Sequence, residues 1–147
     1  MILKRLSSAL VALSFAASPL FAAEYSGRVV HIDDGATFSL KTGDRVLKVR
    51  LCGIRASERG QPGYQDSKKQ LTSYVGKTNV RCVMVGKGAG TPCDGKARST
   101  TRNGIVAQCF LGDADVAAEM VRSGHACDWP KVSGGRYKIN DASCVRN

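Results

Sequence analysis

The feature that most constrains this chain is a run of alternating side chains over residues 45–54. One face of the run carries Leu47, Val49 and Leu51, and the other carries Lys48, Arg50 and Cys52. Successive side chains of a strand point to opposite faces, so this run predicts a strand with one apolar face. Residues 25–32 and 37–41 before it are rich in β-forming residues, and turn signals separate the three segments. The sequence therefore predicts a three-stranded meander.

The rest of the chain adds two helices and two strands. Helical spacing predicts helices over residues 65–75 and 115–123, and each is followed by a glycine that suits its end. Residues 79–85 and 105–111 are predicted strands, with a Gly-, Lys- and Ser/Thr-rich loop over 86–101 between them. The predicted fold class is α+β, mainly β. It is a five-stranded OB-fold barrel with a helix between strands 3 and 4 and a second helix after strand 5.

The N-terminus has the three parts of an export signal. Residues 1–5 form a short basic start, residues 6–21 are mostly apolar, and two alanines follow. The apolar run is short and interrupted by small residues, which favours a signal peptide over a spanning helix. We therefore expect a signal peptide over residues 1–23, one domain over residues 24–147 and a secreted or periplasmic location.

Six cysteines follow the predicted cleavage region: Cys52, Cys82, Cys93, Cys109, Cys127 and Cys144. An even number of cysteines in an exported chain predicts three disulfides. The competing interpretation is a zinc site. No two cysteines have a C-x-x-C spacing and the chain has only 2 histidines, so the sequence gives little support to that interpretation.

The charge of the chain points to anionic partners. The formal net charge is +10, and removal of Lys4 and Arg5 with the signal peptide leaves 10 − 2 = +8. A surplus of this kind favours nucleic acid, acidic polysaccharide or a lipid surface. The alternative interpretation is a charge that only keeps a secreted protein soluble.

Four segments carry short motifs in a fixed order along the chain. They are Asp34-Gly35-Ala36-Thr37, RLCGIRASE from Arg50, TTRNGIVAQC from Thr100, and VAAEMVRSGHA from Val116. These segments resemble, in order, the D-G-D-T turn, the R-L-x-G-I-D-x-P-E segment, the D-R-Y-N-R-x-V-A-x-C strand and the L-V-x-x-G-x-A helix end of the staphylococcal-type thermonuclease family. The resemblance runs from Tyr25 to about Tyr137 and implies a thermonuclease-like OB-fold domain.

The chemistry of that family is metal-assisted hydrolysis of phosphodiesters. Carboxylates hold a hard cation, two arginines stabilise charge in the transition state, and a glutamate orients or deprotonates water. The resemblance makes Arg50 and Glu58 the retained catalytic residues. Ala36 and Arg55 replace two metal-binding carboxylates, and Gly104 replaces the second arginine. Reinstating these three family residues is expected to restore metal binding in part.

The replacements change the charge of the implied pocket by about three units toward positive. We therefore expect that the family's calcium site is lost and that the protein takes no cofactor, because calcium needs about six oxygen ligands. A guanidinium can hold a phosphate in its place. The expected phosphate-binding residues are Arg50, Arg55, Arg59 and Arg102. A second basic segment, with Lys87, Lys96 and Arg98, precedes the fifth strand.

Each of these residues also has a plainer interpretation. Arg50 could be a solvated strand residue, and Arg55 with Glu58 could form only a surface ion pair. His31 is expected at the surface. Trp129 is expected to be half-buried, although an exposed indole could stack on a base.

The resembled barrel also implies how some cysteines pair. Cys82 and Cys109 fall in the fourth and fifth strands at inward positions, so they are predicted to form a disulfide. The remaining predicted pairs are Cys52 with Cys127 and Cys93 with Cys144.

Three hypotheses for function remain. The leading one is an exported, catalytically impaired domain of the thermonuclease family that binds nucleic acid or another polyanion. The second is an active metal-dependent phosphodiesterase with a rearranged site built from Asp33, Asp34 and Glu58. The third is a structural or assembly factor of the cell envelope.

Overall fold

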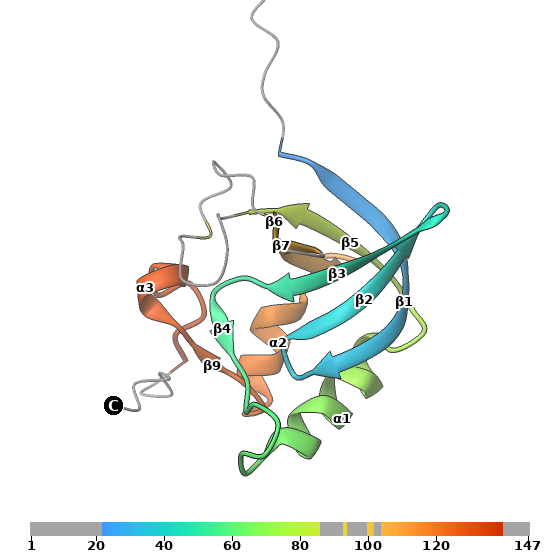
Figure 1. Ribbon diagram of the computed structural model, residues 1–147. Coiled ribbons are helices and arrows are strands. Elements are labelled where there is room, and N and C mark those ends of the chain that lie inside the picture. The colour runs from blue at the N-terminus through green and yellow to red at the C-terminus, as the bar shows by residue number, and fades with distance from the viewer. Residues whose placement is uncertain (1–21, 86–92, 94–99, 102–103, 140–147) are drawn as a thin grey trace, which may run out of the picture.

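The computed structural model describes residues 22–85, 93, 100–101 and 104–139, and its strands close into a barrel (Figure 1). The barrel strands are β1 (Glu24–Asp34), β2 (Thr37–Thr42), β3 (Arg45–Leu51), β5 (Asn79–Met84) and β7 (Gly104–Leu111). They pair in the order β3-β2-β1-β5-β7, and a parallel pairing of β3 with β7 closes the circle. The predicted mainly β, OB-like α+β fold is confirmed.

Four short strands and three helices complete the described chain. The strands are β4 (Ile54–Arg55), β6 (Thr100–Thr101), β8 (Ala114–Asp115) and β9 (Cys127–Asp128). The helices are α1 (Tyr64–Val75), α2 (Val116–Arg122) and α3 (Pro130–Ser133). The first two helices lie within one residue of their predicted bounds. Helix α3 was not predicted, because four residues are too few to show a helical period. Strand β6 was also missed, since it falls at the end of a segment predicted to be a loop.

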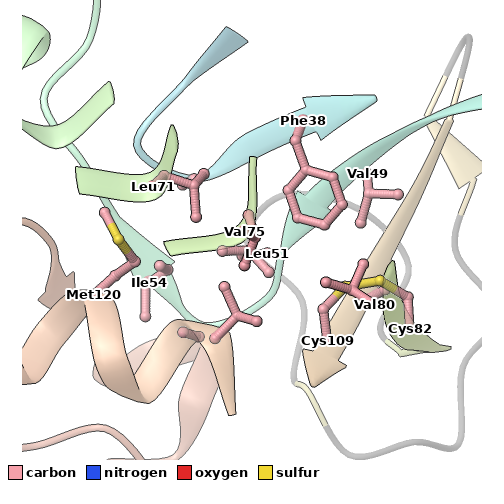
Figure 2. Packing of buried hydrophobic residues seen from close by; sticks show 14 of the residues in the cluster. Phe38, Val49, Leu51, Ile54, Leu71, Val75, Val80, Cys82, Cys109 and Met120 are labelled. Atoms are coloured by element: carbon pink, nitrogen blue, oxygen red, sulfur yellow. A yellow bond between two sulfur atoms is a disulfide. The ribbon is translucent and has the colours of Figure 1, made fainter. Parts of the chain in front are cut away.

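The main core fills the barrel and extends under the first two helices (Figure 2). Leu71 and Val75 of α1 and Met120 of α2 are at most 1% exposed and join the strand side chains there. Cys82 and Cys109 lie directly opposite each other in β5 and β7 and form a disulfide within this core. That pair is the one implied by the resemblance.

A second, smaller apolar cluster lies beyond the end of β3. Its buried members are Cys52, Val85, Cys93, Val106 and Val132. Trp129 packs against the cluster, and Cys93 N donates a hydrogen bond to Val132 O at 2.9 Å. Cys52 and Cys93 form a disulfide inside the cluster.

The predicted pairs Cys52 with Cys127 and Cys93 with Cys144 are therefore wrong. Leu51 points into the main core, so the next residue, Cys52, faces the second cluster, where Cys93 lies. Cys127 is also disulfide-bonded, and Cys144 lies outside the described residues.

The two described disulfides indicate an oxidising, non-cytoplasmic environment. Among the described helices, none has the length and apolar character needed to cross a membrane. Residues 1–21 lie outside the described part, so the signal peptide stays a prediction.

Candidate functional site

The turn between β1 and β2 places the first motif against helix α1. Asp34 Oδ1 accepts a hydrogen bond from Ala36 N at 2.8 Å, which holds the turn closed. A Cβ atom at Gly35 would lie 2.5 Å from Ser67 Cβ and 2.8 Å from Ala56 Cβ, so this close packing requires glycine. Ala36 is fully buried in the main core. The side chain at this position is thus a methyl group, which offers no oxygen to a metal ion.

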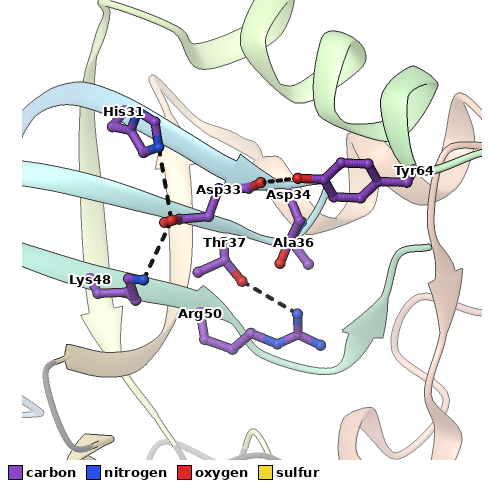
Figure 3. A network of polar contacts seen from close by, with 8 residues as sticks. All are labelled: His31, Asp33, Asp34, Ala36, Thr37, Lys48, Arg50 and Tyr64. Carbon is purple, nitrogen blue, oxygen red and sulfur yellow. Dashed lines mark hydrogen bonds and ion pairs between the residues drawn. The ribbon is translucent and has the colours of Figure 1, made fainter. Parts of the chain in front are cut away.

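Asp33 is the centre of a polar network beside this turn (Figure 3). Its Oδ1 lies 3.4 Å from Lys48 Nζ and 3.9 Å from His31 Nε2. Its backbone oxygen accepts a hydrogen bond from Tyr64 OH at 2.9 Å, which ties α1 to the end of β1. Its Oδ2 is buried and makes no hydrogen bond with any described residue. The network holds this carboxylate between two basic side chains.

Arg50 lies in β3 directly opposite Thr37 of β2. Its Nη1 donates to Thr37 Oγ1 at 3.5 Å (Figure 3). Its Nη2 donates to Ile54 O at 3.3 Å. Both contacts are long and both acceptors are neutral. The guanidinium is therefore oriented by weak hydrogen bonds that a charged ligand could replace.

Three charged side chains, those of Asp34, Arg55 and Glu58, act electrostatically on Arg50. Burial lowers the pKa of Arg50, the Asp34 carboxylate raises it, the Arg55 guanidinium lowers it, and the Glu58 carboxylate raises it. Asp34, Arg55 and Glu58 therefore each lie close enough to act on the guanidinium of Arg50. Arg50 and Arg55 repel each other in this arrangement, which favours an anion between them.

Arg55 is positioned by the short pairing of β4 with β9. It lies opposite Cys127 in that pairing, and Trp129 N donates to Gly53 O at 2.8 Å. The guanidinium carbon of Arg55 is 4.4 Å from the centroid of the Trp129 ring, which is a cation–π contact. Arg55 is exposed and Trp129 is half-buried, so the ring holds the cation at the protein surface.

The remaining predicted site residues lie at the surface or outside the described residues. Glu58 and Arg59 are exposed in the loop before α1. Glu58 N donates to Gln61 Oε1 at 2.8 Å, which closes the loop. Arg102 lies outside the described residues, as do Lys87, Lys96 and Arg98 of the second basic segment.

The packing of the barrel strands requires a glycine at position 104. It is buried in β7 and lies opposite Lys48 in the parallel pairing with β3. A Cβ atom at Gly104 would lie 2.0 Å from Lys48 O, so the two strands approach too closely for any side chain. An arginine cannot be reinstated here without moving the backbone. The rescue that includes Gly104→Arg would therefore need the backbone of β3 or β7 to shift, and it stays a prediction.

The residues around Arg50 do not fit a hard cation. Within the described part of the chain, no three His, Cys, Asp or Glu side chains are grouped so as to hold a metal ion. Asp34 Oδ1 is bound to Ala36 N, Ala36 offers no oxygen, and Arg55 brings a positive charge. Calcium takes six to eight oxygen ligands, several of them anionic. This arrangement suits an anion better than a cation.

The sequence did not predict two contacts of the site. The first is Arg55 on Trp129, which joins segments far apart in the chain and leaves no local pattern. The second is Asp33 between Lys48 and His31. The doubled acidic residue at 33–34 was its one available signal, and it is explained equally well by a turn.

No protein-family model matches this chain. Similar curated proteins carry endonuclease names. An "Uncharacterized endonuclease" of Haemophilus influenzae is 46% identical over 61 residues, which are 41% of this chain and 34% of that protein. The "Probable endonuclease LCL3" of Scheffersomyces stipitis is 31% identical over 105 residues, 67% of this chain and 41% of that protein. The protein of the same name from Clavispora lusitaniae is 31% identical over 104 residues, again 67% and 41%.

This chain thus spans less than half the length of the curated relatives that it matches. The matches show that it has homologues named as endonucleases over as much as two thirds of its own length.

Proposed function

We propose that this protein is an exported domain of the thermonuclease family that binds the phosphodiester backbone of nucleic acid and is impaired in cutting it. The observation that carries the proposal is Arg55. Its guanidinium stands where the resembled family has a metal-binding carboxylate, is held on Trp129 at 4.4 Å, and acts electrostatically on Arg50.

The two guanidiniums supply the chemistry of a phosphate clamp. A guanidinium has five N–H donors in a planar fork that matches two phosphate oxygens. Among the described residues, Arg50 donates only to Thr37 and to the Ile54 carbonyl, at 3.5 and 3.3 Å. A phosphate placed between Arg50 and Arg55 would gain charge-assisted hydrogen bonds and would relieve their mutual repulsion.

Impaired hydrolysis follows from what a guanidinium cannot do. A bound metal ion polarises the phosphoryl oxygen and lowers the pKa of its water ligand. Arg55 can stabilise negative charge, but it generates no hydroxide. Glu58 would then act on water that no metal ion has acidified, so hydrolysis of the phosphodiester would lose most of its rate.

The endonuclease names of the relatives favour a second candidate, an active phosphodiesterase with a rearranged site. Its carboxylates would be Asp33, Asp34 and Glu58. The contacts of Asp33 with Lys48 and of Asp34 with Ala36 N leave fewer oxygens for a metal, which supports the first candidate.

Two assays on the purified protein separate these candidates. Fluorescence anisotropy with labelled oligothymidylate at low salt measures binding, and incubation of plasmid and denatured DNA with calcium measures cleavage. Salt-sensitive binding without cleavage supports the proposal, and cleavage that requires calcium supports the second candidate. Absence of both supports a structural role in the cell envelope.

Matched variants make the binding assay specific. Arg50→Ala with Arg55→Ala should weaken binding to all sequences alike, because phosphate contacts position a strand without reading its bases. Lys69→Ala with Lys138→Ala removes the same charge from exposed positions elsewhere. Equal losses in the two double variants would mean that net charge, not this site, attracts the DNA.

A further inference from the structure

The register of the barrel strands aligns outward side chains in rows across β1, β2 and β3. The alternate side chains of these strands are buried in the main core: Val29, Ile32, Phe38, Leu40, Val49 and Leu51. The side chains between them therefore lie on the outer face. From β1 to β3, the first row is Asp34, Thr37 and Arg50, the second is His31, Ser39 and Lys48, and the third is Arg28, Lys41 and Val46.

These rows lead from Arg50 toward the tip of the β2–β3 hairpin, which extends past the barrel (Figure 1). Strands rise about 3.4 Å per residue and lie about 4.8 Å apart. Rows two residues apart are therefore separated by about 7 Å, and the path from Arg50 to Arg45 is about 17 Å long. The basic side chains of successive rows thus follow one another at regular spacing from Arg50 toward the hairpin tip.

The acidic residues of this face lie at its two ends. Asp33 and Asp34 lie beside the β1–β2 turn, Asp44 lies at the hairpin tip, and Glu24 at the start of β1 is paired with Arg81. The third row has no carboxylate, and neither Arg28 nor Lys41 makes an ion pair with any described residue. Two cations therefore stand next to each other there without compensation.

Apolar side chains flank this pair of cations. Val46 is 59% exposed and lies opposite Lys41. Val30 is 47% exposed and is the extra residue of a β-bulge, because the register shifts between Val29 and His31. A face with cations between exposed apolar groups fits a strand that carries phosphates together with sugars and bases. An inorganic polyanion would gain nothing from the valines.

We propose that the outer face of β1, β2 and β3 is a track for single-stranded nucleic acid, which leads away from the Arg50–Arg55 site. The inference rests on the proposed function and specifies its ligand. Because Arg50 is half-buried, a flexible single strand can turn into the site more readily than a stiff duplex. Arg28 and Lys41 would contact phosphates, and the valines would contact sugars and base edges.

The test compares short and long oligothymidylates by fluorescence anisotropy. An oligomer of about 3 nucleotides should reach only the Arg50–Arg55 site, whereas one of about 12 nucleotides should also fill the track. Arg28→Ala with Lys41→Ala should leave the short oligomer's affinity unchanged. It should weaken the affinity for the long oligomer about five- to tenfold. The slope of log affinity against log salt concentration should become shallower by about 1.4, because two phosphate contacts are lost.

Two controls identify the cause of that loss. Lys69→Ala with Lys138→Ala removes equal charge away from the track and should preserve the affinity gained with length. Val46→Ser should weaken binding of the long oligomer but leave polyphosphate binding unchanged. Thermal melting of each variant checks that it is folded.

The outcomes separate the track from the underlying function. Binding that needs Arg50 and Arg55 but is unaffected by Arg28→Ala with Lys41→Ala overturns the track and leaves the proposed function standing. Failure of the wild type to bind any oligomer overturns both. Equal binding of duplex, or of polyphosphate with the same sensitivity to Val46→Ser, contradicts the assignment of a single-stranded ligand.

Discussion

The guanidinium of Arg55 rests on the ring of Trp129, with 4.4 Å between the guanidinium carbon and the ring centroid. The pairing of β4 with β9 and the bond from Trp129 N to Gly53 O bring the two residues together. The chain has 1 tryptophan. Its fluorescence therefore reports on this contact without interference from other indoles.

Replacing Arg55 by alanine should change the emission of Trp129 and weaken binding of oligothymidylate. The cation–π contact is worth about 0.5–1 kcal/mol at an exposed position, so the fold should survive its loss. Arg55→Lys keeps the charge but not the planar fork, and it should retain only part of the affinity. Emission and affinity that are both unchanged in Arg55→Ala would contradict the role given to this contact.

A calcium site should be recoverable with two substitutions. In Ala36→Asp with Arg55→Asp, a carboxylate enters a fully buried position, so the variant should melt below the wild type when calcium is absent. Calcium at 100 times its dissociation constant should then stabilise the variant by about 2.7 kcal/mol. Thermal melts with and without calcium measure this effect.

The matched control is Ala36→Asn with Arg55→Asn, which has nearly the same shape and no negative charge. It should lose stability without recovering any in calcium. The wild type should also melt at one temperature in both conditions. A wild type stabilised by calcium would show that our assessment of the oxygen ligands is wrong.

Tyr137 should make stability depend on alkaline pH. It is buried and its OH donates to Asp115 Oδ2 at 2.9 Å. Burial, the charge of Asp115 and this hydrogen bond raise the pKa of Tyr137 above its ordinary value of 10.0. Folding thus favours the protonated phenol. Its contribution is complete below about pH 10 and is lost as the pH rises toward the folded-state pKa.

Urea unfolding of the wild type and Tyr137→Phe between about pH 8 and 11 tests this sign. The wild type should be more stable by about 1.5–3 kcal/mol at the lower pH, with the advantage shrinking above pH 10. Asp115→Asn removes a charge that raises the pKa of Tyr137 and should move the loss to lower pH. An advantage that grows with pH would refute the argument.

The barrel could be predicted because its strands carry local signals. Leu47, Val49 and Leu51 alternate with polar residues within one strand, and glycines and aspartates mark the turns. The two bulges of β1 could not be predicted in this way. They depend on the register with β2, and that register is set by side chains of both strands.

In the candidate site, too, the sequence predicted local features but not those set by contacts between distant segments. Motif spacing groups Arg50, Arg55 and Glu58 because the three follow one strand and its loop, and in the structure Arg55 and Glu58 both act electrostatically on Arg50. It could not show that Gly104 is required by the close approach of β3 and β7. It also could not pair Cys52 with Cys93, since the two cysteines meet only through the packing of the second cluster.

The disulfide beside the site should have a local effect that the disulfide inside the barrel lacks. Peptide mapping without reduction should find Cys52 with Cys93, Cys82 with Cys109, and a third linkage that contains Cys127. The first two close loops with sequence separations of 41 and 27 residues. Replacing either pair by alanine should therefore cost a similar amount, up to about 4 kcal/mol by the chain-entropy relation.

The two double variants should differ in their fluorescence and binding. Cys52 adjoins Gly53, whose carbonyl accepts the bond from Trp129 N, so Cys52→Ala with Cys93→Ala should alter Trp129 emission and weaken oligothymidylate binding. Cys82→Ala with Cys109→Ala should leave both unchanged at temperatures where each variant is folded. Equal changes in the two variants would mean that the second cluster adds only global stability. Changes confined to the first variant would show that this cluster positions Arg55 and Trp129 for the ligand.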